Sequence, residues 1–290
     1  MIVIMLILFI GIILFPTISF NGAMTGLTLW AVKVLPALFP AMLITACMMQ
    51  LLPAASKYAY IYIVTCGIFC GFPNGAFACA QYHINNPKEK ICEKIFGYCN
   101  ISGTAFVINY IYHNFLYRFI GLIPLLIIIY TPPLSMLFVT FIRNRKYLTL
   151  KAVKSTKSDE CKLYFSEIFR RAVDTAVENA LKLGGYIVFF SCLSAYCIHI
   201  FSSKSFWGFI ISGLIEITNA TALTAQSMEN KKLAIIFITA FNAFGGISTI
   251  MQTLSVIAGS GLSIKKYIYQ KFICTLFTVG LSIFLIYVLL

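Results

Sequence analysis

Charged side chains are scarce in this sequence, and acidic ones most of all. Only 11% of the 290 residues are charged and nine are Asp or Glu, whereas 60% are hydrophobic and the mean hydropathy is +0.90. A soluble protein cannot cover its surface with so few charges. Apolar runs of about 20 residues, enough to cross a bilayer, recur along the whole chain. We therefore expect an all-α polytopic membrane protein with eight to ten transmembrane or re-entrant helices.

Catalytic and metal-binding motifs are also missing. The sequence has no G-x-S-x-G, Walker loop, H-E-x-x-H or paired-carboxylate pattern, and its three histidines are scattered. Its ten cysteines form no C-x-x-C pair, and most lie in apolar segments, where a thiol behaves as a small hydrophobic group. We expect no enzyme activity, metal site, disulfide or cofactor.

The net charge of +13 comes from basic residues in the loops between apolar runs. The segment 143–162 alone holds seven of the 22 Lys and Arg residues. This distribution is typical of cytoplasmic loops of membrane proteins, so the expected partner is a lipid bilayer and not nucleic acid. The loops 82–95 and 143–162 are predicted to be cytoplasmic, as are Lys231 and Lys232, and Arg118 is predicted to lie outside.

Nine apolar segments are candidate spans, and the first is expected to be a retained helix because no basic region or cleavage site accompanies it. Lys265 and Lys266 join the cytoplasmic side only if the segment from 232 to 264 enters the membrane and returns, and the sequence leaves this open. The candidate spans are 2–20, 34–52, 58–81, 96–115, 119–142, 183–201, 205–228, 232–258 and 267–290.

One further segment, 166–185, is amphipathic and is not expected to span. Its apolar residues, from Ile168 to Ala180, recur at a spacing of four, with charged residues opposite. Such a helix is predicted to lie on the membrane surface. It divides the chain into a first membrane half (1–142), a basic cytoplasmic loop with the surface helix (143–182) and a second membrane half (183–290).

Each half contains two apolar segments that are interrupted by glycine and polar residues. They are CGFPNGA (70–76) and NISGTAF (100–106) in the first half, and GLIEITNATA (213–222) and FNAFGGIST (241–249), with Gln252 nearby, in the second. Within each half the two lie close to 30 residues apart, a pattern typical of transporters built from repeats with discontinuous helices. Broken backbone at membrane depth must be covered by protein or by a polar cavity, so the four interruptions should face one another. Close packing of helices through glycine is the alternative.

Glu216 is the acidic residue that falls in the middle of an apolar segment. A buried carboxylate is unfavourable unless it is paired or protonated. We expect it to bind a coupling proton or Na⁺, or to recognise a donor on a substrate. The alternative is a salt bridge to Lys182 or to another lysine at a helix end.

Together these residues resemble the sporulation integral membrane proteins of the YlbJ type, which carry the nucleoside-recognition Gate domain. The matching stretches follow one another over most of the chain: GLTLWAVKVLPALFPAMLI (26–44), CGFPNGAF (70–77), NISGTAF (100–106), KLGGYIVFFSCLSA (182–195), LIEIT (214–218), and FGGIST (244–249) followed by Gln252. The sequence departs from the family pattern at Phe77, Thr104 and Ile250, where Lys, Pro and His are common.

The resemblance implies two Gate-like halves and a transporter that acts during endospore formation, in the cell membrane or the forespore membrane. Its cargo would be a small polar metabolite, such as a dipicolinate-like anion. The alternatives are a paralogue that carries a nucleoside or another small metabolite, and a non-transporting scaffold; an oligomer is compatible with each. Glu216 would serve the coupling ion, and the expected substrate-binding residues are Phe72, Asn74, Gly75, Asn100, Ser102, Gly103, Thr104, Thr218, Asn219, Gly245, Gly246, Ser248 and Gln252.

Overall fold

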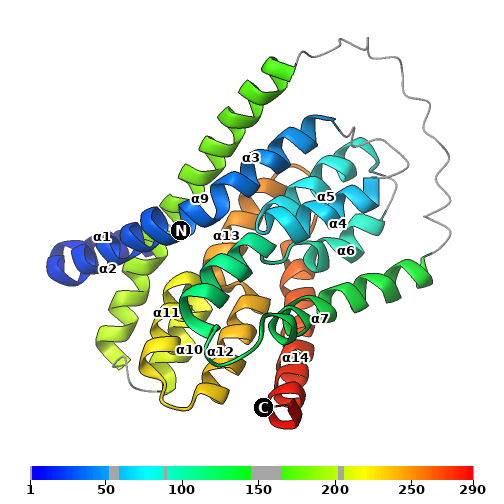
Figure 1. Ribbon diagram of the computed structural model, residues 1–290. Helices are drawn as coiled ribbons and strands as arrows, with labels where there is room; N and C mark the ends of the chain where they lie inside the picture. Colours follow the sequence, from blue (N-terminus) through cyan, green and yellow to red (C-terminus); the bar gives the residue numbers. More distant parts are fainter. Residues whose placement is uncertain (1, 52–58, 88–89, 145–164, 202–205, 290) are drawn as a thin grey trace.

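The computed structural model describes residues 2–51, 59–87, 90–144, 165–201 and 206–289, and the described part is helical with no strand (Figure 1). Five of its helical segments are long and apolar enough to cross a membrane. The prediction of an all-α polytopic membrane protein is confirmed. Most of the predicted basic loop, residues 145–164, lies outside the described residues.

The described residues form a succession of helices, and two stretches, η1 and η2, are π-helical. In chain order they are α1 (Ile2–Leu14), α2 (Pro16–Thr28), η1 (Leu29–Val34), α3 (Leu35–Leu51), α4 (Ala59–Cys70), α5 (Asn74–Asn85), α6 (Ile91–Cys99), η2 (Phe106–Leu116), α7 (Leu122–Arg143), α9 (Phe165–Phe201), α10 (Phe206–Ile215), α11 (Ile217–Ser227), α12 (Lys231–Phe244), α13 (Gly246–Ile257) and α14 (Ile264–Leu289).

Helix α14 defines the two ends of the bundle. Near its start Lys266 pairs with Glu93 of α6, and this ammonium group holds the pKa of the Glu93 carboxyl below its usual value. Near its end the Tyr287 ring lies 5.5 Å from Lys232 Nζ. Because a helix rises about 1.5 Å per residue, the two contacts are roughly 30 Å apart, the thickness of the hydrocarbon core. We call them the Glu93 end and the Lys231 end.

Helices α4 and α5 form a hairpin that enters and leaves at the Glu93 end. Tyr60, at the start of α4, contacts Tyr82, near the end of α5, with ring centroids 5.2 Å apart. Each helix has 12 residues, about 18 Å, too short to cross the hydrocarbon core. The prediction of a span over 58–81 is therefore wrong, because the break at Gly71 to Pro73 turns the chain back.

Helices α10 and α11 form the matching hairpin at the Lys231 end. They pack against each other and have only 10 and 11 residues. Lys231 Nζ donates to the Ala225 and Met228 carbonyl oxygens, at 3.1 and 2.9 Å, so α11 ends where α12 begins. The prediction of a span over 205–228 is wrong for the same reason as in the first hairpin.

Helices α12 and α13 together cross the bundle, with one break at Gly245. Their 26 helical residues span about 39 Å, and the segment qualifies as a single candidate span, Lys231–Ile257. The proposed return of the segment 232–264 to its starting side is therefore wrong. Lys231 and Lys232 lie at the opposite end from Lys266, which corrects their predicted placement on the side of the loop 82–95.

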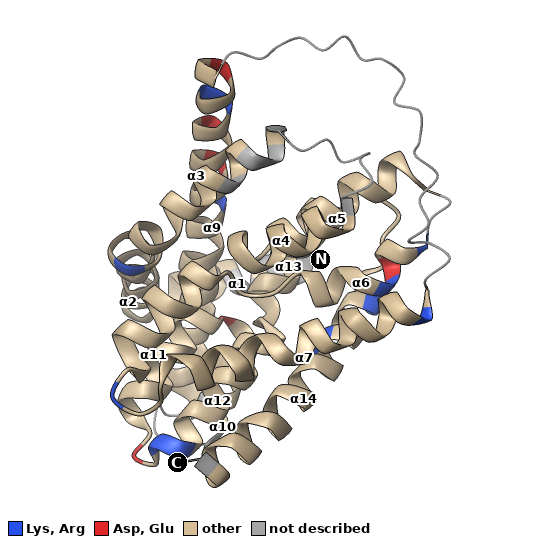
Figure 2. Cartoon of the chain, turned by 45° about the vertical axis from the view of Figure 1, so that its right-hand side comes forward, with Lys and Arg blue, Asp and Glu red and all other residues tan. Residues whose placement is uncertain are grey.

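The charged residues lie toward the two ends of the bundle, and which end faces the cytoplasm stays a prediction. Figure 2 shows Lys, Arg, Asp and Glu gathered toward the ends of the helices, with few charges in the middle. Lys94 Nζ of α6 donates to Asn144 Oδ1, directly after α7, at 2.7 Å. The last residues of the loop 82–95 and the first residues of the loop 143–162 therefore lie at the same end of the bundle. Lys231 Nζ lies 5.5 Å from the Phe119 ring, which places the neighbouring Arg118 at the other end, as predicted.

The same order of elements occurs twice along the chain, in opposite orientations. A long helix, a hairpin, a broken helix and a final long helix appear as α3, α4–α5, α6–η2 and α7, and again as α9, α10–α11, α12–α13 and α14. Corresponding elements make corresponding contacts: α5 packs on α6 and α13, and α11 packs on α12 and η2. The division at residue 142 coincides with the end of α7, whereas the division at 182 falls inside α9.

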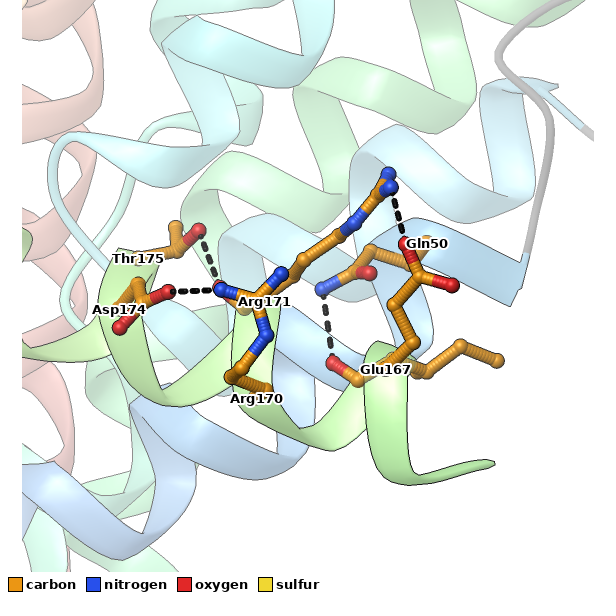
Figure 3. A network of polar contacts seen from close by, with 7 residues as sticks. Gln50, Glu167, Arg170, Arg171, Asp174 and Thr175 are labelled. Atoms are coloured by element: carbon orange, nitrogen blue, oxygen red, sulfur yellow. Dashed lines mark hydrogen bonds and ion pairs between the residues drawn. The ribbon is translucent and has the colours of Figure 1, made fainter. Parts of the chain in front are cut away.

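Helix α9 is continuous over 37 residues, so the predicted surface helix 166–185 is the first part of a membrane helix and not a separate element. Its stripe of Ile168, Ala172, Ala176 and Ala180 is buried because α9 packs along α3 and η1. Gln50 of α3 donates to the Ile168 carbonyl at 3.2 Å. Figure 3 shows Gln50 beside α9 and the ion pairs Arg171–Glu167 and Arg170–Asp174 on the exposed face. The amphipathic pattern of the segment 166–185 therefore arises because its apolar face packs against other helices of the protein.

The N-terminal helices also differ from the predicted spans. The segment 2–20 is interrupted at Phe15, because Pro16 cannot continue a helix and starts α2 instead. Helices α2, η1 and α3 then run on without a gap from Pro16 to Leu51. Gly22 and Gly26 let α2 approach α9: a Cβ atom at Gly22 would lie 2.7 Å from that of Ala195.

The opposite ends can be tested by labelling cysteines at Lys90 and Glu229, two exposed residues at the Glu93 end and the Lys231 end. With an impermeant maleimide on intact cells, Glu229→Cys should react, and Lys90→Cys should react only after lysis, if the end with the basic loops is cytoplasmic as the charge distribution predicts. The unsubstituted chain, whose described cysteines are all buried or half-buried, is the control. Reaction of both variants from one side would contradict this arrangement.

Candidate functional site

The four helix breaks meet around one small cavity in the middle of the bundle. Its volume is about 40 Å³, room for roughly three water molecules. Both halves of the chain line it, and the long helices α3 and α9 close its sides. The lining residues are Val34, Leu38, Cys70, Gly71, Phe72, Ser102, Gly103, Phe106, Leu183, Ile187, Glu216, Ile217, Thr218, Thr249 and Gln252.

In the first half, the tip of the α4–α5 hairpin lies directly on the break between α6 and η2. Gly71 has a φ of 72°, which a side chain rarely adopts, and a Cβ atom there would lie 2.3 Å from the Gly103 backbone nitrogen. Asn74 N donates to the Gly71 oxygen at 2.9 Å and closes the turn. Glycine at both positions lets the two broken backbones touch.

In the second half, the tip of the α10–α11 hairpin lies on the break between α12 and α13. A Cβ atom at Gly246, whose φ is 73°, would lie 3.1 to 3.2 Å from the last carbonyl oxygens of α10. Gly245, with a φ of 91°, ends α12 in the left-handed conformation common at helix ends. Each half thus covers one broken backbone with another.

Hydrogen bonds join the breaks of the two halves. Ser102 donates to Asn242 Oδ1 at 2.5 Å, and the Tyr110 hydroxyl donates to the Thr218 carbonyl at 2.7 Å. The fully buried Asn100 amide contacts the hydroxyls of Thr253 and Tyr267 at 2.9 and 3.1 Å. The expectation that the four interruptions face one another is confirmed.

Glu216 lies at the tip of the second hairpin, 2% exposed, and lines the cavity. Its two carboxylate oxygens accept from the backbone N–H groups of Thr218 and Asn219, at 2.9 and 2.7 Å. The side chain therefore caps α11 and lies in the partial positive charge of its N-terminus. The alternative salt bridge to Lys182 is not formed, because Lys182 pairs with Glu178 at 2.6 Å.

A second cavity, of about 250 Å³, adjoins the first. The two share Leu38, Cys70, Phe72, Leu183 and Gln252. Along three helices the second cavity is lined one turn nearer the Glu93 end, by Met42 of α3, Asn179 and Lys182 of α9, and Ser255 and Val256 of α13. Phe72 and Gln252 therefore stand between the inner cavity and a wider space toward the Glu93 end.

The structure brings six of the predicted site residues into the inner cavity: Phe72, Ser102, Gly103, Glu216, Thr218 and Gln252. The others lie behind the lining, several with structural contacts. Asn100 bonds α13 and α14, Ser248 accepts from Gln252 at 3.3 Å, and the glycines Gly245 and Gly246 form the break itself. Those that line neither cavity are Asn74, Gly75, Asn100, Thr104, Asn219, Gly245, Gly246 and Ser248.

Several residues around the breaks were missed by the sequence analysis. Thr249 of the lining lies between two predicted residues, one position from Ser248, and could have been included on that pattern. Lys271 was missed because it follows Lys265 and Lys266 closely and resembles one more basic residue at a helix end. It is instead 2% exposed, and its Nζ donates to the Asn100 carbonyl at 3.2 Å. No sequence signal marks the aliphatic lining from α3 and α9.

Comparisons of the chain with known protein families, with curated proteins and with solved structures found no match. The function is therefore inferred from the arrangement of the breaks, the two cavities and the buried charged groups.

The glycines of the first hairpin are expected to be required for packing. A Cβ atom at Gly67 would lie 1.7 Å, and one at Gly75 2.3 Å, from the Cys99 carbonyl oxygen. Gly67→Ala and Gly75→Ala should each reduce stability by about 1–3 kcal/mol or more, because the hairpin must move off α6. Gly280→Ala, with nothing within 4 Å, is the matched control in a helix. Thermal unfolding in detergent measures the effect, and equal stability of Gly75→Ala and Gly280→Ala would contradict it.

Proposed function

We propose that this protein transports a small polar solute, which binds where the four helix breaks meet. The observation that supports the proposal is the pair of oppositely inserted hairpins, α4–α5 and α10–α11, whose tips lie at one cavity with several polar groups in its lining. Broken helices at the midplane, in halves of opposite orientation, are how many transporters build a site that can open to either side. Motion of one half against the other would provide the alternating access.

The sizes and positions of the two cavities support an assignment of this structure to one state of the transport cycle. The inner cavity has room for only a few water molecules, whereas the wider cavity lies toward the Glu93 end. On the other side, the Tyr110–Thr218 bond ties η2 to the tip of the second hairpin. The solute would enter from the Glu93 end and reach the inner site when Phe72 and Gln252 move aside. Loss of the Tyr110 contact would open the Lys231 end.

The finer identity of the solute rests on the resemblance to the sporulation proteins of the YlbJ type. We propose a dipicolinate-like anion, transferred during endospore formation across the cell membrane or the forespore membrane. A nucleoside or another small metabolite is the alternative cargo. Hydroxyl and amide groups of Ser102, Thr218 and Gln252 would orient either solute.

A second candidate function is a scaffold that uses this fold for packing alone. The observation that favours it is the direct backbone contact at both pairs of breaks, since close helix packing needs glycines at such positions. A scaffold has no use for a polar cavity lining, so its polar residues would matter only for stability.

Substitution of two buried glutamines distinguishes the transporter from the scaffold. Gln252 lines both cavities, whereas Gln270 bonds α14 to α6 through Gly97 N and the Glu93 carbonyl, at 2.8 and 3.0 Å. Gln252→Leu should leave membrane abundance normal and reduce solute flux at least tenfold. Gln270→Leu should reduce abundance, because it leaves buried backbone groups unpaired.

Flux of labelled pyridine-2,6-dicarboxylate and of uridine into proteoliposomes, normalised to protein content, measures both variants. The scaffold would be supported if the wild type transported neither solute and if Gln252→Leu and Gln270→Leu changed membrane abundance to the same extent.

The coupling role of Glu216 predicts a change in ion dependence. Glu216→Gln keeps the shape but removes the charge, and its amide can cap only one of the two N–H groups. We expect flux to fall and to lose its dependence on pH or on Na⁺. Unchanged flux, ion dependence and pH profile would show that Glu216 only caps α11.

A further inference from the structure

Lys271 presents a buried ammonium group that has no carboxylate partner among the described residues. Its side chain is 2% exposed, and its Nζ donates one hydrogen bond, to the Asn100 carbonyl oxygen at 3.2 Å. Among the described residues no carboxylate lies within 4.0 Å of it; the ion pairs of that region use Lys266 instead. An ammonium has three donors, and burying it unpaired is costly.

The ring of Phe72 covers this ammonium group on the side of the cavities. Lys271 Nζ lies 4.7 Å from the ring centroid, a cation–π distance. Phe72 lines both the inner and the wider cavity, whereas Lys271 lines neither. The ring therefore shields the charge from the space that a solute would occupy. Phe72 sits at the hairpin tip, next to the Gly71 backbone that only glycine readily adopts.

We propose that Lys271, with Phe72 as its shield, forms an anion subsite that holds one carboxylate group of the solute. This rests on the transport function proposed above and adds the charge class of the cargo. When Phe72 turns aside, the ammonium faces the inner cavity, and a carboxylate replaces the ring as its partner. The exchange is favourable because a buried ion pair with satisfied hydrogen bonds replaces a weaker cation–π contact.

Glu216 sets the orientation of the bound solute. It lies at the tip of the second hairpin, and its carboxylate oxygens accept from backbone N–H groups at the N-terminus of α11. An anion is repelled there and attracted at Lys271, so the carboxylate of the solute points to the first hairpin. Its other end, a hydrogen-bond donor or a neutral ring, points to Glu216.

The competing explanation is that Lys271 only stabilises the end of α6. Asn100 follows the last residue of this helix, and a cation near a helix C-terminus is favourable. That role predicts the same effect of Lys271 on stability whatever the charge of an added solute. The anion subsite predicts a difference between charged and uncharged solutes of equal shape.

Pyridine-2-carboxylate and its uncharged analogue pyridine-2-carboxamide are the probes. Binding is measured by calorimetry on the purified full-length protein in detergent. Wild type should bind the carboxylate at least tenfold more tightly than the carboxamide. Lys271→Met should remove this preference, and Lys271→Arg should retain most of it. Lys265→Met, an exposed lysine on the same helix, should behave as wild type and controls for net charge.

The shield provides an independent test if Lys271→Met fails to accumulate. Phe72→Leu leaves the ammonium in place and removes the aromatic cover, so the affinity for the carboxylate should rise severalfold while that for the carboxamide does not. An unchanged affinity for the carboxylate in Phe72→Leu, or an unchanged preference in folded Lys271→Met, overturns the anion subsite. So does a wild type without preference for the carboxylate.

The two proposals fail in different ways. Flux of uridine that depends on Gln252, together with no preference for the carboxylate, overturns the anion subsite and leaves the transporter. Absence of flux for every solute in proteoliposomes overturns both.

Discussion

The structure depends on one constraint: a backbone N–H or C=O group at membrane depth needs a partner, because the hydrocarbon core offers none. In the described part of the chain, the breaks of α4–α5, α6–η2, α10–α11 and α12–α13 satisfy the constraint by lying against one another. Gly71 touches Gly103, and Gly246 touches the last carbonyls of α10. Asn100 then bonds the first pair to α13 and α14. The glycines are needed because any Cβ atom would separate the backbones.

The same arrangement leaves polar groups around a space. Where two pairs of breaks meet, their side chains cannot fill the centre completely, and a cavity lined by Ser102, Thr218 and Gln252 remains. Two buried charged groups of the second half lie near it, Glu216 in its lining and Lys271 behind the ring of Phe72. Glu216 is compensated by the helix that it caps, whereas Lys271 is covered by an aromatic ring. The site therefore has a direction of charge, from the Lys271 ammonium group to the Glu216 carboxylate.

Local patterns predicted the breaks correctly and the path of the chain through the membrane less well. Gly, Pro and Asn in CGFPNGA end a helix for reasons within a few residues, so the break at 70–76 was predictable. Whether the chain turns back there, as α4 and α5 do, depends on contacts such as Tyr60 with Tyr82, which are 22 residues apart. The opposite error occurred at Gly245, where a return was considered and α13 continues across. The wrong side for Lys231 and Lys232 followed from these errors.

By itself, the sequence determined the class of the protein, the positions of the four breaks and six of the residues around the inner cavity, because hydrophobicity and helix-breaking chemistry act locally. Only the tertiary structure decided which breaks turn the chain and which helix covers the amphipathic face of α9. It also decided that Lys271, five residues beyond an exposed lysine, is buried beside Phe72. The physical reason is that burial and charge pairing are set by helices distant in the chain, and no single segment carries that information.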